Sequence, residues 1–491
     1  MVSFEKNSIY LIGALTSKPY AFTARSWELE RVDFYDFYDS FLSPVCLDLR
    51  GLSVMRVLPR INEDVSEEWI SDKIRFSYDG FRRQRLLVPY YRKDLGFKEV
   101  SWEESFFYFF FKYNLFAYDY INSQSLEVLI GKFIDIESMV SMKLFFENFK
   151  DSIVKFSYFK SLFSRNLYPS DYSFNYSLKE MQSLDFCILL GVNLRYESPL
   201  LHLKLVRLAN RGLIIFSFMS NGDSKIKSFS LGNSFKDLLF FLNGNSKYSV
   251  LMTRMKKKLV LFGESFKFFN NEMSLQNIMN QFSLRGFYVS HLIQNVSYSS
   301  FLSLGFSNQK FLEKSFDKDF LFLYDTDDII LKTKASFVVY QGHHGDYGSS
   351  IANLIFPSTF LLEKKGSFFN NESSELIKYR FVLNPGDKVR TDWRIFSGLA
   401  AFFSFDNYDI YDYVSLIKRC QYYIAYYTGK CDPLVLDSIN FKEISIRKYN
   451  NNIGYSMYID YYLNDSVSRA SKVMALSALR FKNNFINFVK N

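Results

Sequence analysis

The sequence predicts an α/β fold with doubly wound, mostly parallel sheets, preceded by a small β-rich module. The first observation is a strand–helix–strand unit, in which apolar runs at residues 184–191 and 213–218 enclose a stretch with helical capping signals. The second is that similar short apolar runs recur at residues 259–262, 320–324 and 337–340. Buried strands that alternate with helices are typical of parallel sheets joined by right-handed crossovers.

The helix of this unit has recognisable ends. Ser198 can cap its first turn, Pro199 suits the first helical position, and Gly212 follows the expected end near Asn210. His202 falls within this helix on a mostly apolar face. Because the sequence offers no partner ligands around it, we expect His202 to be a core histidine rather than a metal ligand.

The small module is predicted from a β-hairpin. Residues 45–49 and 53–58 have the composition of strands, and Arg50-Gly51 between them suits a tight turn. Residues 67–73 follow and predict a short polar helix. We expect its charged side chains to form a solvated or docking face rather than a catalytic set.

Composition argues against two classes of protein. The net charge is +9, and the basic runs at residues 82–85 and 256–258 are short, which disfavours nucleic-acid binding. The most apolar run, residues 106–116, is interrupted by Lys112 and is shorter than the roughly 20 residues of a membrane-spanning helix. We therefore expect a soluble or peripheral protein. The 55 phenylalanines and 35 tyrosines suggest an AT-rich, organellar genome.

The four cysteines are far apart in the sequence. They are Cys46, Cys187, Cys420 and Cys431, and no C-x-x-C pair occurs among them. This spacing disfavours both a disulfide scaffold and a cluster held by four cysteines, and it fits a reducing compartment. Cys187 lies in an apolar run, so we expect it to be a small core residue.

The most distinctive stretch begins with the predicted strand at residues 337–340. The chain then enters a glycine-rich loop that contains His343, His344 and Asp346. Such a loop after a strand is where α/β folds place binding chemistry. Adjacent histidines on a strand point to opposite faces, and no third ligand follows at a usual spacing. We therefore favour a structural loop, whose imidazoles bond to the backbone, over a metal or general-base site.

This loop also carries a resemblance. Residues 338–348 read VVYQGHHGDYG, and this stretch is similar to the signature of the large iron–sulfur subunit of respiratory complex I, the 75 kDa subunit, which also has a bacterial form. Further matching positions are Ala352, Ile355, Pro357, Glu363, Lys364, Asn371, Glu372, Arg390, Asp392, Trp393 and Ile395. Residues 13–22, 48–80 and 188–205 also resemble this family.

The resemblance implies specific departures from the family. Tyr10 stands where the family has a cysteine that ligates a 4Fe-4S cluster, and the β-rich module retains Cys46 as its single cysteine. The loop after residue 190 resembles a pterin-binding loop of molybdenum enzymes, with Val192 and Leu194 at altered positions, and complex I is understood to hold no pterin there. We therefore expect no catalytic, cofactor-binding or metal-binding residue in this chain, and no cofactor.

The resemblance also implies an organisation in three parts. Residues 1–40 would be a remnant of the junction with a ferredoxin-like cluster domain, and residues 41–95 a 4Fe-4S-like module without cluster ligands. Residues 96–491 would form a molybdopterin-oxidoreductase-like domain with a variable C-terminal tail.

On this interpretation the protein is a structural, non-catalytic subunit of NADH:ubiquinone reductase (H+-translocating). It would lie in the peripheral arm on the matrix side of the mitochondrial inner membrane, peripheral to the membrane and without nucleic acid. Other peripheral-arm subunits would be its partners, including a separate cysteine-rich chain that carries the N-terminal half and the iron–sulfur clusters. The lack of a presequence in residues 1–8 suggests synthesis inside the mitochondrion. The alternatives are a molybdopterin-dependent oxidoreductase related to formate dehydrogenase, or a cofactor-free binding module of the same fold.

Overall fold

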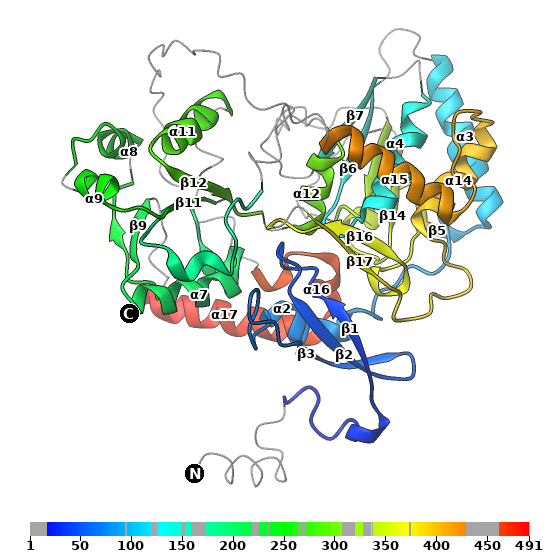
Figure 1. Cartoon of the computed structure of the whole chain (residues 1–491). Coiled ribbons are helices and arrows are strands. Elements are labelled where there is room, and N and C mark those ends of the chain that lie inside the picture. Colours follow the sequence, from blue (N-terminus) through cyan, green and yellow to red (C-terminus); the bar gives the residue numbers. More distant parts are fainter. Residues whose placement is uncertain are drawn as a thin grey trace.

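Two parallel sheets stand side by side, each flanked by helices, and a small antiparallel sheet lies beneath the junction between them (Figure 1). The predicted fold class is therefore confirmed. The computed structural model describes residues 17–93, 96–119, 125–149, 153–158, 173–218, 225–233, 235–246, 248–263, 266, 272–293, 295–306, 320–327, 335, 337–372, 375–428 and 461–490.

The first parallel sheet has five strands in the order β10-β9-β8-β11-β12. They are β8 (Phe186–Leu190), β9 (Ile214–Phe218), β10 (Phe229–Ser230), β11 (Lys258–Phe262) and β12 (Phe287–His291). The helices between them are α6 (Leu194–Glu197), α7 (Pro199–Asn210), α8 (Phe235–Leu242), α9 (Ser249–Arg254) and α11 (Glu272–Leu284). All neighbouring strands run parallel, and β8 and β11 are buried along their whole length, as their continuous apolar sequences require.

The predicted strand–helix–strand unit is β8, α7 and β9. Pro199 is the first residue of α7, as predicted, and Gly212 follows its end with φ +115°. Ser198 occupies the capping position, but its side chain makes no capping hydrogen bond. The polar loop before it contains a further helical turn, α6, which the apolar pattern did not indicate.

The second parallel sheet has seven strands in the order β5-β4-β15-β14-β13-β6-β7. They are β4 (Tyr90–Lys93), β5 (Gly96–Glu99), β6 (Ser125–Ile130), β7 (Ile153–Tyr158), β13 (Phe320–Tyr324), β14 (Phe337–Gly342) and β15 (Leu354–Pro357). Its helices are α3 (Trp102–Asp119), α4 (Ile136–Glu147), α12 (Val296–Ser303), α13 (Tyr347–Ile351), α14 (Asp392–Phe403) and α15 (Tyr413–Thr428). The hairpin β4–β5 runs antiparallel at one edge, and β16 (Gly366–Phe369) and β17 (Leu376–Tyr379) form a separate pair.

The small module contains β1 (Glu30–Tyr35), β2 (Pro44–Arg50) and β3 (Ser53–Pro59), and the predicted hairpin is β2–β3. The predicted helix over residues 67–73 is wrong, because α2 spans Asp72–Phe76 instead. The side chain of Ser71 accepts a hydrogen bond from Ile74 N–H and fixes this later start. Glu67 has φ +53°, which a right-handed helix cannot contain.

The C-terminal residues return to the junction beneath the two sheets. They form η6 (Tyr461–Leu463), α16 (Ser466–Ala470) and α17 (Lys472–Lys490), and α17 runs from the small module beneath the five-stranded half (Figure 1). Cys187 is fully buried, as predicted, and Cys46 and Cys420 are buried as well. Cys431 and Tyr10 lie outside the described residues. Among the residues that the structure describes, no helix is long and apolar enough to cross a membrane.

Candidate functional site

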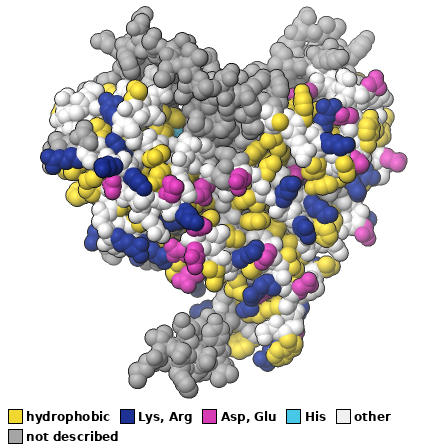
Figure 2. Space-filling model, in the orientation of Figure 1, with side chains coloured by type: hydrophobic (Ala, Val, Ile, Leu, Met, Phe, Trp, Pro, Cys, Tyr) yellow, Lys and Arg dark blue, Asp and Glu magenta, His cyan; other side chains and the backbone are white. Residues whose placement is uncertain are grey.

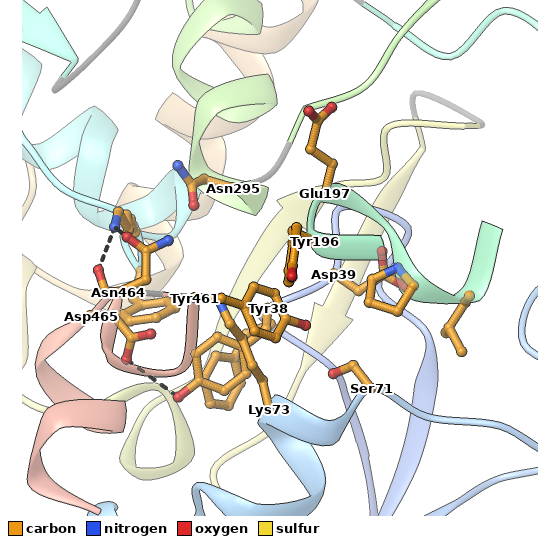
Figure 3. A pocket seen from close by; sticks show the side chains of 15 residues that line it. Tyr38, Asp39, Ser71, Lys73, Tyr196, Glu197, Asn295, Tyr461, Asn464 and Asp465 are labelled. Carbon is orange, nitrogen blue, oxygen red and sulfur yellow. Dashed lines mark hydrogen bonds between the residues drawn. The ribbon is translucent and has the colours of Figure 1, made fainter. Parts of the chain in front are cut away.

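The carboxyl ends of both parallel sheets face one narrow, partly open cleft. Strands β6, β8 and β12 lead into it, and the small module and the C-terminal residues complete its walls (Figure 3). Its polar lining includes Tyr38, Asp39, Ser71, Lys73, Lys132, Tyr196, Glu197, Asn295, Tyr461, Asn464 and Asp465. Ligands of open α/β sheets bind at this position, so we take the cleft and its margins as the candidate site.

The two adjacent histidines lie behind Phe133, which lines this cleft, and they face each other. The Nδ1 atoms of His343 and His344 are 2.5 Å apart, and both side chains are buried. Adjacent histidines would point to opposite faces if they lay on a strand, but these two lie in the loop, as expected. Because β14 ends at Gly342, neither histidine is held in the extended geometry of the strand.

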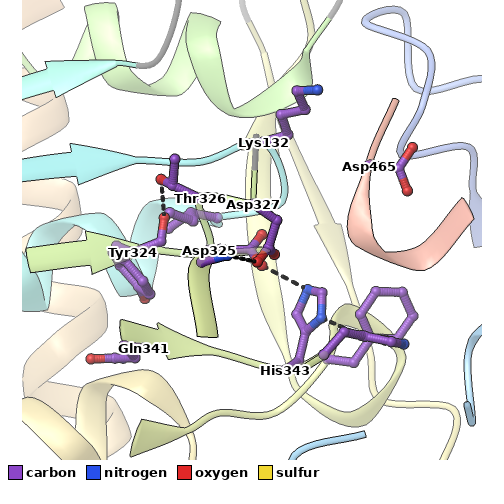
Figure 4. Close-up of polar contacts among 12 residues, drawn as sticks. Lys132, Tyr324, Asp325, Thr326, Asp327, Gln341, His343 and Asp465 are labelled. Carbon is purple, nitrogen blue, oxygen red and sulfur yellow. Dashed lines mark hydrogen bonds and ion pairs between the residues drawn. The ribbon is translucent and has the colours of Figure 1, made fainter. Parts of the chain in front are cut away.

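The contacts of the pair determine where its protons lie. His344 Nε2 is 3.0 Å from the carbonyl oxygen of Gly80 and must donate to it, so its Nδ1 is left to accept from His343 Nδ1–H. His343 Nε2 then carries a lone pair, 3.2 Å from Asp325 Oδ1 (Figure 4). A carboxylate cannot donate to this lone pair, and in the described part of the chain neither His343 Nε2 nor the Asp325 carboxyl oxygens make a hydrogen bond, so the two buried groups are close neighbours without a bond between them.

The electrostatics agree with neutral groups at all three positions. Burial raises the pKa of Asp325 well above its ordinary value, and the nearby Asp327 raises it further. Burial lowers the pKa of His343 well below its ordinary value and that of His344 to about 3. Within the described residues no group of three or more His, Cys, Asp or Glu side chains could hold a metal ion. The pair therefore acts as an internal hydrogen-bonded link, with His344 on the backbone as expected.

Asp346, which the sequence places beside the histidines, binds an arginine instead of a metal. Arg469 Nε lies 2.5 Å from Asp346 Oδ2, and its Nη2 donates to the carbonyl of Asp327 at 2.6 Å. The carboxylate of Asp327 accepts from the Tyr340 hydroxyl at 2.8 Å. Burial, together with the charge of Asp346, raises the pKa of Asp327 to about 7.

A buried lysine forms a second charged cluster under the seven-stranded sheet. Lys364 Nζ lies 2.5 Å from Asp135 Oδ1 and 2.6 Å from Asp392 Oδ2. Asp392 also accepts from Gln341 Nε2 at 2.9 Å. Burial alone lowers the pKa of Lys364, but the two carboxylates outweigh it and raise this pKa above its ordinary value. Resemblance to the family marked Lys364 and Asp392 but not Asp135, which no local pattern marks.

The loop after β8 is closed by the protein's own atoms. Gly191 has φ +57°, and a Cβ there would meet the backbone nitrogen of Phe266 at 2.5 Å. The backbone N–H of Asn193 donates to Glu197 Oε1 at 3.1 Å. A Cβ on Gly263 would lie 2.3 Å from the carbonyl oxygen of Gly191. These contacts occupy the space and the N–H group that a bound phosphate would need.

His202 lies on α7, as predicted, but it is half-buried rather than a core residue. Burial lowers its pKa, and the charges of Arg195 and Lys225 lower it further. The helix turns its most buried face, which includes Leu201, toward the sheet and leaves His202 beside that face.

Two family models match the chain. The model for molybdopterin oxidoreductase matches residues 85–402, and the model for the NADH-ubiquinone oxidoreductase NDSU1/NuoG-like 4Fe-4S domain matches residues 29–79.

Curated relatives align along most of the chain. The NADH-ubiquinone oxidoreductase 75 kDa subunit of Acanthamoeba castellanii is 33% identical and covers 97% of this chain and 70% of the relative. The subunit of the same name from Reclinomonas americana is 31% identical over 96% of this chain and 72% of the relative. A NADH-quinone oxidoreductase subunit of Rickettsia felis is 28% identical over 94% and 68%. Acetylene hydratase from Pelobacter acetylenicus shares the fold, with a TM-score of 0.55, 10% identity, and coverage of 81% of this chain and 72% of that structure.

The residues present do not fit the iron–sulfur cluster that the second model's description implies. Such clusters are held by about four thiolates, and residues 29–79 contain Cys46 as their single cysteine. Its Sγ lies 3.4 Å from Asp33 Oδ1, and burial raises the pKa of this thiol, so the thiolate is disfavoured. A molybdopterin cofactor does not fit the loop after β8 either, because Phe266 and Glu197 already occupy the contacts that its phosphates would make.

Proposed function

Because the chain belongs to the family of the NADH-ubiquinone oxidoreductase 75 kDa subunit, we propose that it works in complex I as a structural subunit of the peripheral arm. Its relatives of that name align along 97% and 96% of the chain. It supports the path of electrons from NADH to ubiquinone without taking part in the chemistry. One observation among the described residues supports a structural role most directly. The loop after β8 lies at the edge where this fold binds its ligands, and the chain's own atoms close it.

The proposal includes a division of labour between two chains. The clusters would lie in a separate cysteine-rich chain, which would supply the N-terminal half of the subunit on the matrix side of the inner membrane. The support for this part is compositional: Tyr10 replaces a family cysteine, and Cys46 is the single cysteine of the module. We retain the division into residues 1–40, 41–95 and 96–491 as part of the same proposal.

Mass spectrometry of the native complex that contains this chain tests the assembly. We expect complex I subunits and a short cysteine-rich chain to migrate with it. A full-length subunit that carries both halves in the same complex would contradict the two-chain arrangement. Migration of the chain alone would contradict the structural role in complex I, and molybdenum in the pure protein would favour the oxidoreductase alternative.

The non-catalytic role is tested by separating assembly from turnover. His343→Gln removes one member of the buried histidine pair, which no substrate contacts in our proposal. We expect fewer assembled complexes but the same rate of NADH oxidation per assembled complex. His202→Gln on α7 is the matched control, and it should leave both quantities near the wild-type values. A fall in the rate per assembled complex for His343→Gln alone would assign this pair a part in the reaction.

A further inference from the structure

The C-terminal residues bind the margin of the seven-stranded sheet at two points. Arg469 pairs with Asp346 and donates to the carbonyl oxygen of Asp327, as described above. Lys132, which follows β6, donates from Nζ to the carbonyl oxygen of Asn464 at 2.7 Å and to its side-chain oxygen at 3.0 Å. The loops after β6, β13 and β14 are thus all tied to one short segment.

The same segment binds the small module. The carboxylate of Asp79 accepts from the Ser471 hydroxyl and, at 3.0 Å, from the backbone N–H of Lys472. Gly80 packs directly on α16, because a Cβ at this position would lie 2.3 Å from the carbonyl oxygen of Val467. This approach is open to glycine and closed to residues with a side chain.

The five-stranded sheet is reached through aromatic rings. The ring of Tyr461 lies 5.1 Å from that of Tyr196 on α6, and Phe481 of α17 lies 6.1 Å from Tyr196. Lys73 of the module places its Nζ 4.4 Å from the centre of the Tyr461 ring (Figure 3). Tyr461 therefore stands between the five-stranded half and the module.

We propose that residues 461–481 are a built-in clamp, which fixes the two parallel sheets and the small module to one another by bridging the walls of the cleft where this kind of fold binds its ligands. Domains joined by polar surfaces are otherwise free to move relative to each other. The C-terminal clamp replaces the stabilisation that a bound ligand would give, since it supplies its own cation, Arg469, to the aspartates at the strand ends. This inference does not depend on membership of complex I.

Hydrogen exchange on the intact complex that contains the chain tests the clamp. Arg469→Ala should accelerate exchange at least about tenfold at residues 131–133 and 194–197, on both sides of the cleft, as well as at 461–472. Arg480→Ala, an exposed arginine in α17, is the matched control and should change none of these segments. Faster exchange confined to residues 461–472 would overturn the proposal, because the segment would then be a passive tail.

A second variant disturbs the clamp without changing charge. Gly80→Ala should displace α16 and give the same pattern on both sides of the cleft, whereas Gly386→Ala, which has nothing within 4 Å of its added Cβ, should not. If neither clamp variant assembles, exchange in the unaltered complex decides. Residues 461–472 and 131–133 should then open at one common rate, and separate rates would overturn the proposal. The clamp is judged by exchange rates, whereas the proposed function is judged by which subunits migrate with the chain. A result that contradicts one therefore leaves the other untouched.

Discussion

The two parallel sheets close their carboxyl edges in different ways, although their topology is alike. The seven-stranded sheet gathers buried and partly buried charges and balances them, with Lys364 between Asp135 and Asp392 and Arg469 on Asp346. The five-stranded sheet instead closes by contact between backbones, at Gly191 and Gly263. The difference teaches that one half should be sensitive to the loss of a charge, and the other to the gain of a single methyl group.

Basic and acidic side chains are also interspersed over the face of the molecule in Figure 2. A one-sided basic surface would favour nucleic acid as a partner, and this face offers none among its described residues. The contrast between the two halves is thus a property of their interiors.

The largest effect is expected from Lys364→Met in the seven-stranded half. Removal of the ammonium leaves Asp135 and Asp392 buried without a counter-charge, which should lower the free energy of unfolding by about 3–5 kcal/mol. The urea midpoint of the whole chain measures this loss. Lys365→Met changes the exposed neighbour and should cost less than about 1 kcal/mol. Equal losses of stability in the two variants would mean that the charge of Lys364 does not stabilise the two buried aspartates.

The next effect is a change in the pH dependence of stability. The pKa of His344 is lowered from 6.5 to about 3, so between these values the unfolded chain binds a proton that the folded chain does not. Stability from this group is complete above pH 6.5 and is lost as the pH falls, by up to about 1.4 kcal/mol per pH unit. The amide of His344→Gln can still donate to the Gly80 carbonyl oxygen but does not titrate. This variant should therefore lose less stability as the pH falls below 6.5.

Two controls bear on the His344 prediction. Asp327 contributes the opposite slope between pH 3.8 and about 7, but it does so in both proteins, so the difference between them reports the His343–His344 pair. His202→Gln in the five-stranded half should change the slope less, because His202 is half-buried. Parallel pH curves for wild type and His344→Gln would show that the buried imidazole is protonated in the folded protein.

A smaller loss is expected from Gly263→Ala in the five-stranded half. The new methyl group would meet the Gly191 carbonyl oxygen at 2.3 Å and Val192 Cα at 2.7 Å, so the backbone must shift, at about 1–3 kcal/mol. Thermal unfolding measures it, with Gly386→Ala as the control in open space. A neutral result would show that this edge is loosely packed and that the contrast between the two sheets does not hold.

The smallest effect is expected from Arg207→Ala at the surface between α7 and the module. Arg207 pairs with Glu67, but the two side chains are 44% and 38% exposed. Solvent weakens such a pair, so the loss should stay below about 1 kcal/mol and shrink further with added salt. A loss as large as that of Lys364→Met would mean that this contact holds the module in place.

Much of the fold could be predicted because its signals are local. Continuous apolar runs marked β8, β9, β11, β13 and β14, and the turn at Arg50-Gly51 marked the module. The start of α2 was missed because Ser71 and the positive φ of Glu67 act through local geometry that charge patterning does not reveal.

The site was harder to predict than the strands. Asp135 meets Lys364, and Asp346 meets Arg469, across long separations in sequence, and no local pattern links such partners. The contact between His343 and His344 depends on where β14 ends. The apolar run ends at residue 340, whereas the strand continues to Gly342. Resemblance marked several of these positions, but it gave no pairing among them.

The order of the strands has a consequence for how the chain is made. Strand β6 pairs with β13, yet the whole five-stranded sheet lies between them in the sequence. A chain that leaves the ribosome from its N-terminus can therefore complete the five-stranded sheet before β13, the strand that pairs with β6, has been synthesised. Until then the pair formed by β6 and β7 exposes the unpaired, apolar edge of β6. Chaperones bind such edges, and aggregation begins at them.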